Sequence, residues 1–458
     1  MKILVIGAGR VGSSVAENLV SEKNDITVVD TDKAQLGYLQ ERFDLRTVCG
    51  DGSSPDILAL AGADDTDLLV SCAATDAVNL VTCKIAKDVF NIPRCISRVR
   101  GAYYAKHPEI LHDQFGVDST ISPEASVTEY LFSLVEFPDA IQVVKFAEGR
   151  LSVAIVQIGK RSTLLDYQID QEHLNLPHGK GRILELVRNG ESLPLQRVFN
   201  LKVGDELVVA MDTSEVADAV MRLNKDKRRT RAVMIAGGGN IGARLAISLA
   251  EQGYNIRIIE QNKARCEQLA TLLPEQVLVL QGNGTDESLL VSENIEEMDT
   301  WVAVTNDDEN NIMSSLLAKR LGAHKVIALI SRQAYGELME GSMIDVAVSP
   351  SQATIGALLH DVRQGAVVRG HRLRRGQAEA IEFEVVGDKD SSHVVGKMIS
   401  DLRLPRTAQI AAILREDEVL IPENDTVILQ GDHVVVYAAS REVMKRVEKM
   451  FQVSALFV

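Results

Sequence analysis

The stretch Gly7-Ala8-Gly9-Arg10-Val11-Gly12 returns 230 residues later as Gly237-Gly238-Gly239-Asn240-Ile241-Gly242. Each copy follows a short apolar run and precedes a helix-length segment, and an acid, Asp30 or Glu260, stands 23 residues after its first glycine. In this context the Gly-x-Gly-x-x-Gly pattern is typical of a dinucleotide-binding βαβ unit. The first glycine permits a tight turn, the second lets a pyrophosphate approach the backbone, and the third lets the helix pack close to the sheet. The sequence therefore predicts two phosphate-binding loops.

Other motifs recur in the same order, which indicates that a unit of about 230 residues is duplicated. Arg100 matches Arg332 at an offset of 232, and Gly204-Asp205 matches Gly431-Asp432 at an offset of 227. In each copy, apolar runs alternate with amphipathic segments of helix length, as in a parallel sheet that is covered on both faces. The expected strands are 3–6, 26–29, 45–48, 68–71, 96–99 and 119–121, and then 233–236, 256–259, 277–280, 301–304, 326–330 and 346–348.

We therefore expect an α/β protein with two tandem doubly wound, Rossmann-like domains, each followed by a small α+β lobe that is richer in strands. The expected bounds are 1–138 and 232–365 for the Rossmann-like domains, 139–224 and 366–453 for the lobes, and 225–231 for a linker. Five of the seven linker residues are basic, so a docking patch is the alternative interpretation of that segment.

The last helix of each Rossmann-like domain has a clear start signal. Ser122-Pro123 and Ser349-Pro350 each combine an N-cap residue with proline at the first helical position. An apolar stripe follows in both copies. The stripe is expected to pack either on its own sheet or against another subunit.

Composition excludes several classes of protein. The 458 residues carry a formal charge of −15, which disfavours a direct nucleic-acid role. No apolar run approaches the roughly 18 residues that a membrane span needs. A strand-like run follows Met1-Lys2 at once, which leaves no room for a signal peptide, and the five cysteines form no Cys-x-x-Cys pair. A cytoplasmic protein is expected.

The remaining candidate ligand-binding residues follow the fourth and fifth strands, at the carboxyl edge where open α/β sheets bind ligands. Asp30 and Glu260 would accept hydrogen bonds from ribose hydroxyls and repel a 2′-phosphate, so NAD(H) or adenosine nucleotides are favoured over NADP. The two loops after the fourth strands and the arginines after the fifth strands are Ala73-Ala74-Thr75-Asp76, Thr305-Asn306-Asp307-Asp308, Arg98, Arg100 and Arg332.

The arginines suit a phosphate or an adenine face, and surface salt bridges are the alternative. Asp76 and Asp308 are expected to be solvated loop residues rather than metal ligands, because no ligand-spaced cluster accompanies them. Catalytic groups are also missing: His107 and His112 occur in the first copy only, and Tyr103-Tyr104-Ala105-Lys106 lacks the Tyr-x-x-x-Lys spacing of short-chain reductases. A ligand sensor is expected rather than an enzyme.

Beyond the glycine motif, the chain resembles the TrkA family of regulatory subunits of bacterial Trk potassium-uptake systems, built from RCK (KTN) domains. The resemblance covers essentially the whole chain and is carried by KILVIGAGRVG (2–12), FDLRTVCGDGSSPDILALAGADDTDLLV (43–70), VVKFAEGRLSVAIV (143–156) and AVTNDDENNIMSSLLAKRLGA (303–323). It implies a non-enzymatic gating subunit that binds NAD(H) and, as a further ligand class, ATP or ADP. A TrkH- or TrkG-like membrane transporter would be its partner, reached from the inner face of the membrane. Four chains would form a gating ring of eight units.

The resemblance also implies which residues form each site. The first site would use Gly7, Ala8, Gly9, Arg10, Val11, Asp30, Ala73, Ala74 and Arg98, with Arg100 beside it. The second would use Gly237, Gly238, Gly239, Asn240, Ile241, Glu260, Thr305, Asn306 and Arg332. Ala73-Ala74 stands where a Thr-Asn pair is common in the family, so backbone groups would serve there and the two sites would prefer different nucleotides. The alternatives are an RCK regulator of another cation channel or antiporter and, less favoured, a redox enzyme.

Overall fold

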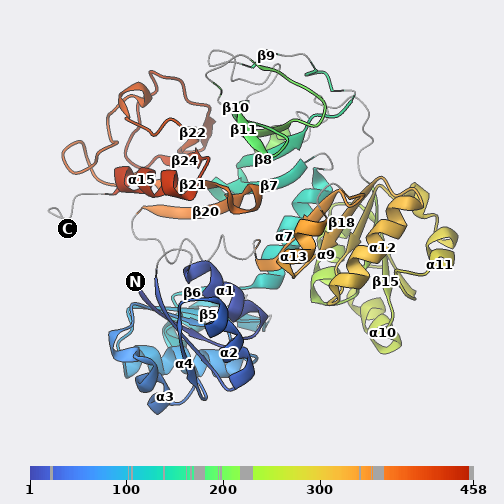
Figure 1. Cartoon of the computed structure of the whole chain (residues 1–458), viewed down its shortest axis with the longest axis horizontal. Helices are drawn as coiled ribbons and strands as arrows, with labels where there is room; N and C mark the ends of the chain where they lie inside the picture. The colour runs from blue at the N-terminus through green and yellow to red at the C-terminus, as the bar shows by residue number, and fades with distance from the viewer. Residues whose placement is uncertain are drawn as a thin grey trace. The chain divides into compact units, whose positions relative to one another are not determined.

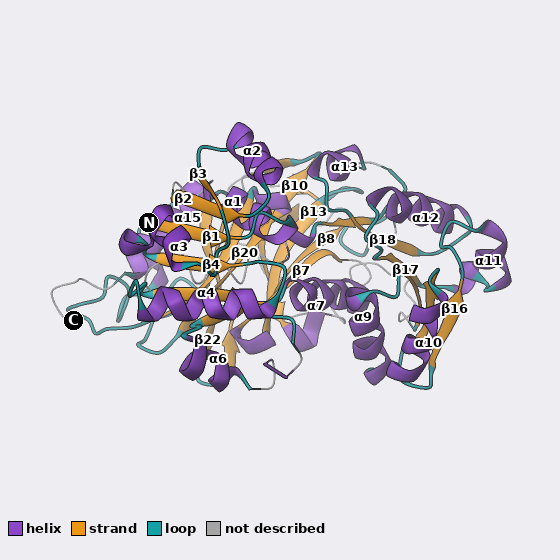
Figure 2. Ribbon diagram, turned by 90° about the horizontal axis from the view of Figure 1, so that it is seen from below, coloured by secondary structure: helices purple, strands orange, loops and turns teal. Residues whose placement is uncertain are grey.

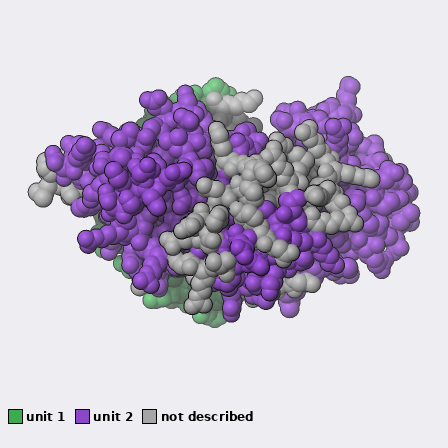
Figure 3. Space-filling view, turned by 90° about the horizontal axis from the view of Figure 1, so that it is seen from above, with its two compact units in different colours: residues 1–126, 353–362 green, residues 127–352, 363–458 purple. Residues whose placement is uncertain are grey.

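The computed structural model describes most of the chain: residues 1–20, 24–101, 103–104, 107–137, 140–160, 162–165, 168–169, 181–193, 195, 199–216, 231–339, 342–351, 353 and 366–452. These residues fall into two compact units (Figure 3), one with residues 1–126 and the other with the described parts of 127–352 and 363–458. The predicted linker and the helix predicted after Ser349-Pro350 lie almost wholly outside the described residues. The predicted domain bounds stay predictions.

The first unit is built on a six-stranded parallel sheet with the strand order β3-β2-β1-β4-β5-β6 (Figure 1). Its strands are β1 (Lys2–Ile6), β2 (Asp25–Asp30), β3 (Arg46–Cys49), β4 (Leu68–Ser71), β5 (Arg94–Arg98) and β6 (Ser119–Ile121). Its helices are α1 (Arg10–Val20), α2 (Lys33–Arg42), α3 (Pro55–Ala61), α4 (Asp76–Asp88) and α6 (Pro108–Phe115). The order reverses between β1 and β4, which is the topological switch point of a doubly wound fold.

Both faces of this sheet are buried because successive residues of a strand point to opposite sides. Ile3 and Val5 join the cluster formed with α1 and α2, whereas Leu4 and Ile6 join the cluster formed with α3, α4 and α6. The prediction of a covered parallel sheet is thereby confirmed, and the strand ends differ from the expected ones by at most two residues.

The second copy repeats this sheet inside the second unit, with the order β16-β15-β14-β17-β18-β19. Its strands are β14 (Ala232–Ala236), β15 (Asn255–Glu260), β16 (Val277–Gln281), β17 (Thr300–Ala303), β18 (Lys325–Leu329) and β19 (Val346–Val348). Its described helices are α9 (Asn240–Glu251), α10 (Lys263–Leu272), α11 (Glu287–Ser292), α12 (Asp308–Arg320) and α13 (Gln333–Leu338).

Two small antiparallel sheets form the lobes. The first has the order β11-β10-β13-β8-β7, and the second has the matching order β23-β22-β24-β21-β20. The elements of the first lobe are β7 (Ala140–Phe146), β8 (Leu151–Gln157), β9 (Gln168–Ile169), β10 (Gly181–Arg188), β11 (Glu191–Leu193), β12 (Phe199–Asn200) and β13 (Glu206–Asp212). Those of the second lobe are β20 (Val367–Leu373), β21 (Ala378–Glu384), β22 (Ala408–Arg415), β23 (Glu418–Leu420), β24 (His433–Ala438) and α15 (Arg441–Phe451).

The predicted hairpin is present in the first lobe, where Arg188 pairs with Glu191 across Asn189 and Gly190. Both turn residues have positive φ, 53° and 81°, as a type I′ turn requires. In the second lobe Arg415 pairs with Glu418 in the same way, and Glu416 adopts a φ of 52° there without the help of a glycine or asparagine.

Helix α7 (Pro123–Glu136) begins in the first unit and continues into the second. The apolar stripe predicted for it is buried inside the chain: Val127, Leu131 and Leu134 are at most 1% exposed. Figures 1 and 2 both show α7 beside α9, which lies in the second Rossmann-like domain. The stripe therefore packs in the second unit, and not in either of the two places that the sequence suggested.

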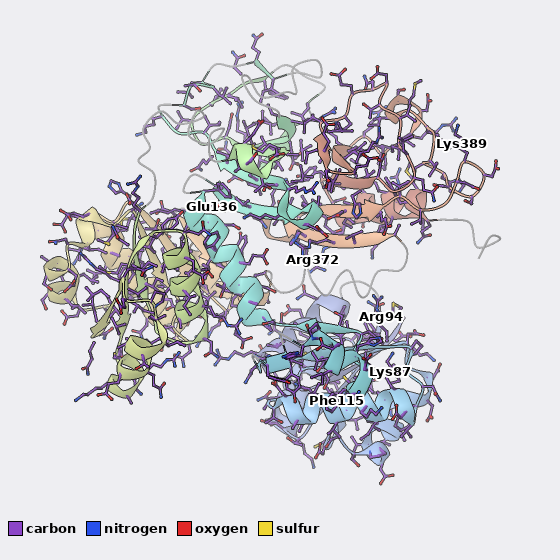
Figure 4. The ribbon with its side chains drawn as sticks, turned by 180° about the vertical axis from the view of Figure 1, so that it is seen from behind. Lys87, Arg94, Phe115, Glu136, Arg372 and Lys389 are labelled. Carbon is purple, nitrogen blue, oxygen red and sulfur yellow. The ribbon has the colours of Figure 1, made fainter. Side chains whose placement is uncertain are left out.

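A buried lysine fixes the end of this helix. Lys325, at the start of β18, donates from Nζ to the carbonyl oxygens of Leu134 (2.9 Å) and Ala140 (3.2 Å). The last carbonyls of a helix lack intrahelical donors and carry partial negative charge, so a buried ammonium group suits them. Glu136, labelled in Figure 4 at the end of α7, accepts from Lys145 Nζ of β7 at 3.2 Å. The helix, the first lobe and the second Rossmann-like domain are thus joined by polar contacts as well as by packing.

Candidate nucleotide-binding sites

The fold itself explains the first and the last glycine of each Gly-x-Gly-x-x-Gly motif. Gly7 has a φ of 99°, and a Cβ there would lie 2.8 Å from the carbonyl oxygen of Cys72. A Cβ at Gly12 would lie 1.7 Å from the carbonyl oxygen of Gly7. Gly237 (φ 112°) and Gly242 are confined in the same way, with 2.0 Å between a Cβ at Gly242 and the oxygen of Gly237. These positions require glycine whether or not a ligand binds.

The middle glycine of each loop has no such explanation. A Cβ at Gly9 or at Gly239 would meet no atom of the described residues within 4 Å. Neither residue has a left-handed backbone, and Gly239 has a φ of −68° that any residue adopts. Each stands just before the first turn of α1 or α9, whose first N–H groups have no intrahelical acceptor. The space beside them is where a phosphate would approach the helix N-terminus.

The two acids hold the loops in place. Asp30 accepts from the N–H of Ala8 at 2.5 Å and from that of Asp32 at 2.8 Å. Glu260 accepts from the N–H of Gly238 at 2.9 Å and from that of Asn262 at 2.8 Å. The sequence predicted ribose-binding acids and missed this structural role. A carboxylate has about four lone-pair positions, so both acids retain capacity for ribose hydroxyls.

The carbonyl oxygen of the second loop residue distinguishes the two sites. In the first site Ser13 Oγ donates to the oxygen of Ala8 at 2.6 Å. Alanine replaces this serine in the second copy, where Arg265 Nε of α10 donates to the oxygen of Gly238 at 2.8 Å. The residue at the matching position of α2 is the exposed Gln35. In the second site, the guanidinium of Arg265 and the carboxylate of Glu260 therefore bind the same loop residue, a feature that only the structure reveals.

Buried asparagines shape the loops that follow β4 and β17. Asn79 accepts from the N–H of Ala73 (2.7 Å) and donates to the carbonyl oxygens of Ala73 (3.2 Å) and Arg98 (2.9 Å). Asn311 binds the N–H, hydroxyl and carbonyl of Thr305 in the corresponding loop. The backbone N–H of Ala73 is therefore engaged by Asn79, although the sequence suggested it as a nucleotide contact. The exposed positions of these loops are Ala74 and Thr75 in the first copy and Asn306 and Asp307 in the second.

The first-site arginines meet an acid of helix α7. Arg98 Nη2 donates to Glu124 Oε1 at 2.8 Å, and both side chains are largely buried, with exposures of 11% and 20%. Arg98 Nε is buried and has no hydrogen-bond partner in the described part of the chain. Arg100, nearly half exposed, approaches the same carboxylate at 3.7 Å. A phosphate placed here would find one unsatisfied donor and one ion pair that it could replace.

In the second site, Arg332 lies on the surface. Its Nη1 donates to Glu309 at 2.7 Å and to the hydroxyl of Tyr335 at 2.9 Å, and its guanidinium lies 5.0 Å from the centre of the Tyr335 ring. The hydrogen bonds to Glu309 from its own backbone and from Tyr335, with the charge of Arg332, lower the pKa of that carboxyl. Arg332 therefore forms a surface salt bridge in this structure, which is the alternative interpretation given above for the arginines.

The repeat match between Arg100 and Arg332 is wrong by one residue. Asp76 accepts the N–H groups of Arg100 and Gly101, and Asp308 accepts those of Ser331 and Arg332. Arg332 thus corresponds to Gly101, because the first copy has one more residue between its fourth helix and fifth strand. Asp308 is 6% exposed, so this carboxylate is a buried anchor for the loop and not the solvated residue that was expected.

Other features of the described residues bear on the site. Burial raises the pKa of the Cys72 thiol, beneath the first loop, to about 12, so it stays protonated at neutral pH. Within the described ranges, no group of three or more His, Cys, Asp or Glu side chains is arranged to hold a metal ion. Over the same ranges no helix has the length and apolarity needed to cross a membrane.

Comparisons with known proteins agree with this geometry. The TrkA-N domain family matches residues 3–123 and 233–350, and the TrkA-C domain family matches residues 384–452. The chain is 42% identical over 460 residues to the Trk system potassium uptake protein TrkA of Vibrio alginolyticus, with 100% of both chains covered. Relatives such as this are named for potassium uptake and not for an enzyme class, in agreement with the prediction of a non-enzymatic protein.

Two solved structures share the fold. The GsuK RCK domain superposes with a TM-score of 0.62 at 18% identity, covering 98% of this chain and 94% of its own. The GsuK channel bound to NAD superposes with a TM-score of 0.61 at 17% identity, covering 98% of this chain and 78% of its own. Since the sequence matches span the whole length, this chain belongs to the TrkA family of Trk system potassium uptake proteins.

Proposed function

We propose that this chain is a nucleotide-sensing subunit that gates a Trk-type potassium transporter, and that its glycine loops bind NAD(H) and, as a further ligand class, ATP or ADP. The observation that carries the proposal is the middle glycine of each loop. Neither packing nor backbone geometry requires glycine at Gly9 or Gly239, yet both are glycine and both lie at a helix N-terminus. A phosphate that must approach the backbone gives the missing reason.

The surrounding residues fit a nucleotide. The loop, the acid and the β4–α4 connection adjoin one another: Asp30 binds Ala8, and a Cβ on Gly7 would lie 3.0 Å from the N–H nitrogen of Ala73. The unsatisfied Nε of Arg98 supplies a donor suited to phosphate. The GsuK channel, which shares this fold, has been solved bound to NAD, and this supports the same ligand class here.

The pair Arg98–Glu124 gives the first site a route to the rest of the chain. Glu124 lies in the first turn of α7, and α7 ends against Lys325 of the second Rossmann-like domain. A phosphate that takes Arg98 from Glu124 would release the start of this helix and thereby change its position. A nucleotide can shift the equilibrium between two conformations of the chain only by the difference in its binding free energy for them. Going from a 1:99 to a 99:1 ratio of the two conformations requires a difference of about 5.5 kcal/mol.

Assembly into a ring of four chains is the form in which this switch would act on the transporter. Val81 of α4 and Met313 of α12 occupy matching positions in the two copies, and they are 44% and 59% exposed. An apolar side chain exposed at the same place in both domains suits contact with neighbouring domains of like structure. The ring would attach at the cytoplasmic face of the membrane through a TrkH- or TrkG-like partner.

The proposal is tested by co-purifying the full chain with a TrkH-like transporter and measuring potassium flux in vesicles across a series of NADH, NAD, ATP and ADP. Flux should depend on the nucleotide with the parent chain and lose that dependence with the double variant Gly9→Ala/Gly239→Ala. Gly37→Ala, on the surface of α2 with no atom within 4 Å of its new Cβ, is the matched control. Potassium flux that is the same with and without every nucleotide would contradict the proposal of a nucleotide sensor. Failure of the chain to restore potassium uptake in deficient cells would favour the alternative that it regulates another cation channel or antiporter.

A further inference from the structure

The two lobes pack on each other through nearly equivalent faces. Their elements are related by a constant offset of 227 residues, and β7 adjoins its counterpart β20, as Figure 1 shows. Gln142 of β7 donates to the carbonyl oxygen of Arg372 (2.9 Å; Arg372 is labelled in Figure 4). The counterpart of Gln142, Arg369, donates to the oxygen of Lys145, which is the counterpart of Arg372 (3.3 Å). These reciprocal bonds describe an approximate two-fold axis between the lobes.

One half of this interface buries a charged cluster. Glu185 of the first lobe accepts from Arg374 Nη1 of the second lobe at 3.1 and 3.2 Å, and also from the hydroxyl of Tyr437. The side chains of Glu185 and Arg374 are 4% and 8% exposed, and Tyr437 is 1% exposed. An ion pair this deeply buried contributes little net stability, but removing one partner is costly.

Among the described residues, the other half of the interface has no matching Glu–Arg–Tyr cluster. The offset of 227 relates Glu185 to Ala412, Arg374 to Ala147 and Tyr437 to Ala210. All three alanines are at most 2% exposed and belong to the apolar core that both lobes share. The same asymmetry recurs at Glu382 of the second lobe, which accepts the N–H of Ala147 at 2.9 Å and corresponds to Ile155. The two faces therefore share a backbone and differ in their buried polar groups.

This asymmetry decides which lobes can pair. If two first lobes met through this face, Glu185 would lie against Ala147 and Ala210 of the other copy and would be buried without a cation. If two second lobes met, Arg374 and Tyr437 would lie against Ala412 in place of Glu185, and Arg374 would take the place of Ala147 beside Glu382 of the other copy. Pairing of two first lobes therefore leaves an uncompensated charge out of water, whereas one first lobe with one second lobe satisfies every member of the cluster. Specificity of this kind comes from an energetic penalty on the wrong pair of lobes rather than from additional stabilisation of the right pair.

We propose that the Glu185–Arg374–Tyr437 cluster is the determinant that makes a first lobe accept only a second lobe as its partner. Every chain of an oligomer contributes one lobe of each kind with the same backbone, so shape alone does not prevent like lobes from pairing. The cluster prevents the pairing of two first lobes because such a pair would bury a charge without its partner. This role does not depend on nucleotide binding.

Redirecting the pairing by charge reversal tests the proposal in full-length chains. One chain carries Glu185→Arg and the other carries Arg374→Glu, so that each is mismatched internally while the first lobe of each matches the second lobe of the other. Arg150 and Asp417 form an exposed ion pair across the same interface, which makes them the reporter positions. Arg150→Cys is placed on the first chain and Asp417→Cys on the second, and Cys49 and Cys266 are replaced by serine in both. A short bismaleimide then links the two chains only if a first lobe has met the second lobe of another chain.

The expected result is that the interchain crosslink becomes the main product for co-expressed charge-reversed chains and stays at background for the same reporters without charge changes. A single chain that carries both Glu185→Arg and Arg374→Glu should regain the melting temperature that each single reversal loses, which shows that the variants can fold. The proposal is overturned if folded charge-reversed chains give no interchain crosslink, or if either single reversal leaves the melting temperature unchanged.

Discussion

The substitution Gly9→Ala separates a glycine kept for a ligand from a glycine kept for the fold. The new Cβ would meet no atom within 4 Å, and the backbone there is not left-handed. Replacing glycine by alanine restricts the unfolded chain, which raises the free energy of unfolding by about 0.4–1 kcal/mol. Alanine is also a poorer N-cap residue than glycine, which lowers the free energy of unfolding by about the same amount. These two effects nearly cancel, so the melting temperature should stay within about 3 °C of the parent.

Binding should respond very differently. The methyl group would occupy the approach of a phosphate to the first N–H groups of α1, where each hydrogen bond to a charged group contributes roughly 1.5–3 kcal/mol. Loss of one such bond weakens binding by roughly 10- to 150-fold. Calorimetric titration of the full chain measures this change at the first site, and Gly239→Ala reports on the second site by the same reasoning.

Two further variants serve as controls, one that should destabilise the fold and one that should change neither stability nor binding. Gly12→Ala should destabilise the domain strongly, because its Cβ would lie 1.7 Å from the oxygen of Gly7, and it should do so with or without nucleotide. Gly37→Ala should change neither stability nor affinity by much. The reasoning is refuted if Gly9→Ala folds as well as the parent and binds each nucleotide with the parent affinity.

Three other predictions concern the second site, α7 and the lobe interface. Arg265→Gln, which copies Gln35 of the first site, removes the cation that binds the carbonyl oxygen of Gly238. It should raise the preference for NADH over NADPH at the second site several-fold, about 1 kcal/mol, in competitive titrations, and an unchanged ratio would show that Arg265 does not affect this preference. Lys325→Met removes the donor to the carbonyl oxygens of Leu134, in the last turn of α7, and Ala140, at the start of β7. It should lower the free energy of unfolding by roughly 2 kcal/mol in urea titrations, an effect that would be absent if water replaced the ammonium group. Burial and the charge of Arg369 lower the pKa of His371 to about 3, so the unfolded chain binds more protons below pH 6.5. Stability should therefore fall from pH 6.5 toward pH 3, by at most roughly 5 kcal/mol, in thermal melts that His371→Phe makes less dependent on pH.

The parts of the fold that depend on local pattern could be predicted from the sequence. Apolar runs placed all twelve strands of the two parallel sheets within two residues, because a strand buried on both faces needs an unbroken apolar segment. The Asn189-Gly190 turn was predicted because only a few residues tolerate positive φ at both turn positions. The glycine loops and their acids were found from the Gly-x-Gly-x-x-Gly pattern and from its fixed spacing to the acid.

The features that the sequence could not reveal depend on long-range contacts. The partner of Arg98 is Glu124, which lies on a helix 26 residues away in the chain, and no local spacing marks it. Arg265 replaces Ser13 as the donor to the loop carbonyl from a different helix. The destination of the α7 stripe depends on a domain that begins about 100 residues later, and one additional residue before β5 was enough to misplace the match between Arg100 and Arg332.

The most direct measurement is a calorimetric titration of the folded, intact chain with NADH, and then with ATP and ADP, at fixed ionic strength. Saturable heat with at least one of these compounds, reduced in Gly9→Ala or Gly239→Ala and retained in Gly37→Ala, is the outcome expected if the loops hold an adenine nucleotide. Absence of saturable heat with all three, from protein whose melting transition is intact, would mean that the middle glycines serve no such ligand and that the sensor proposed here has no signal to detect.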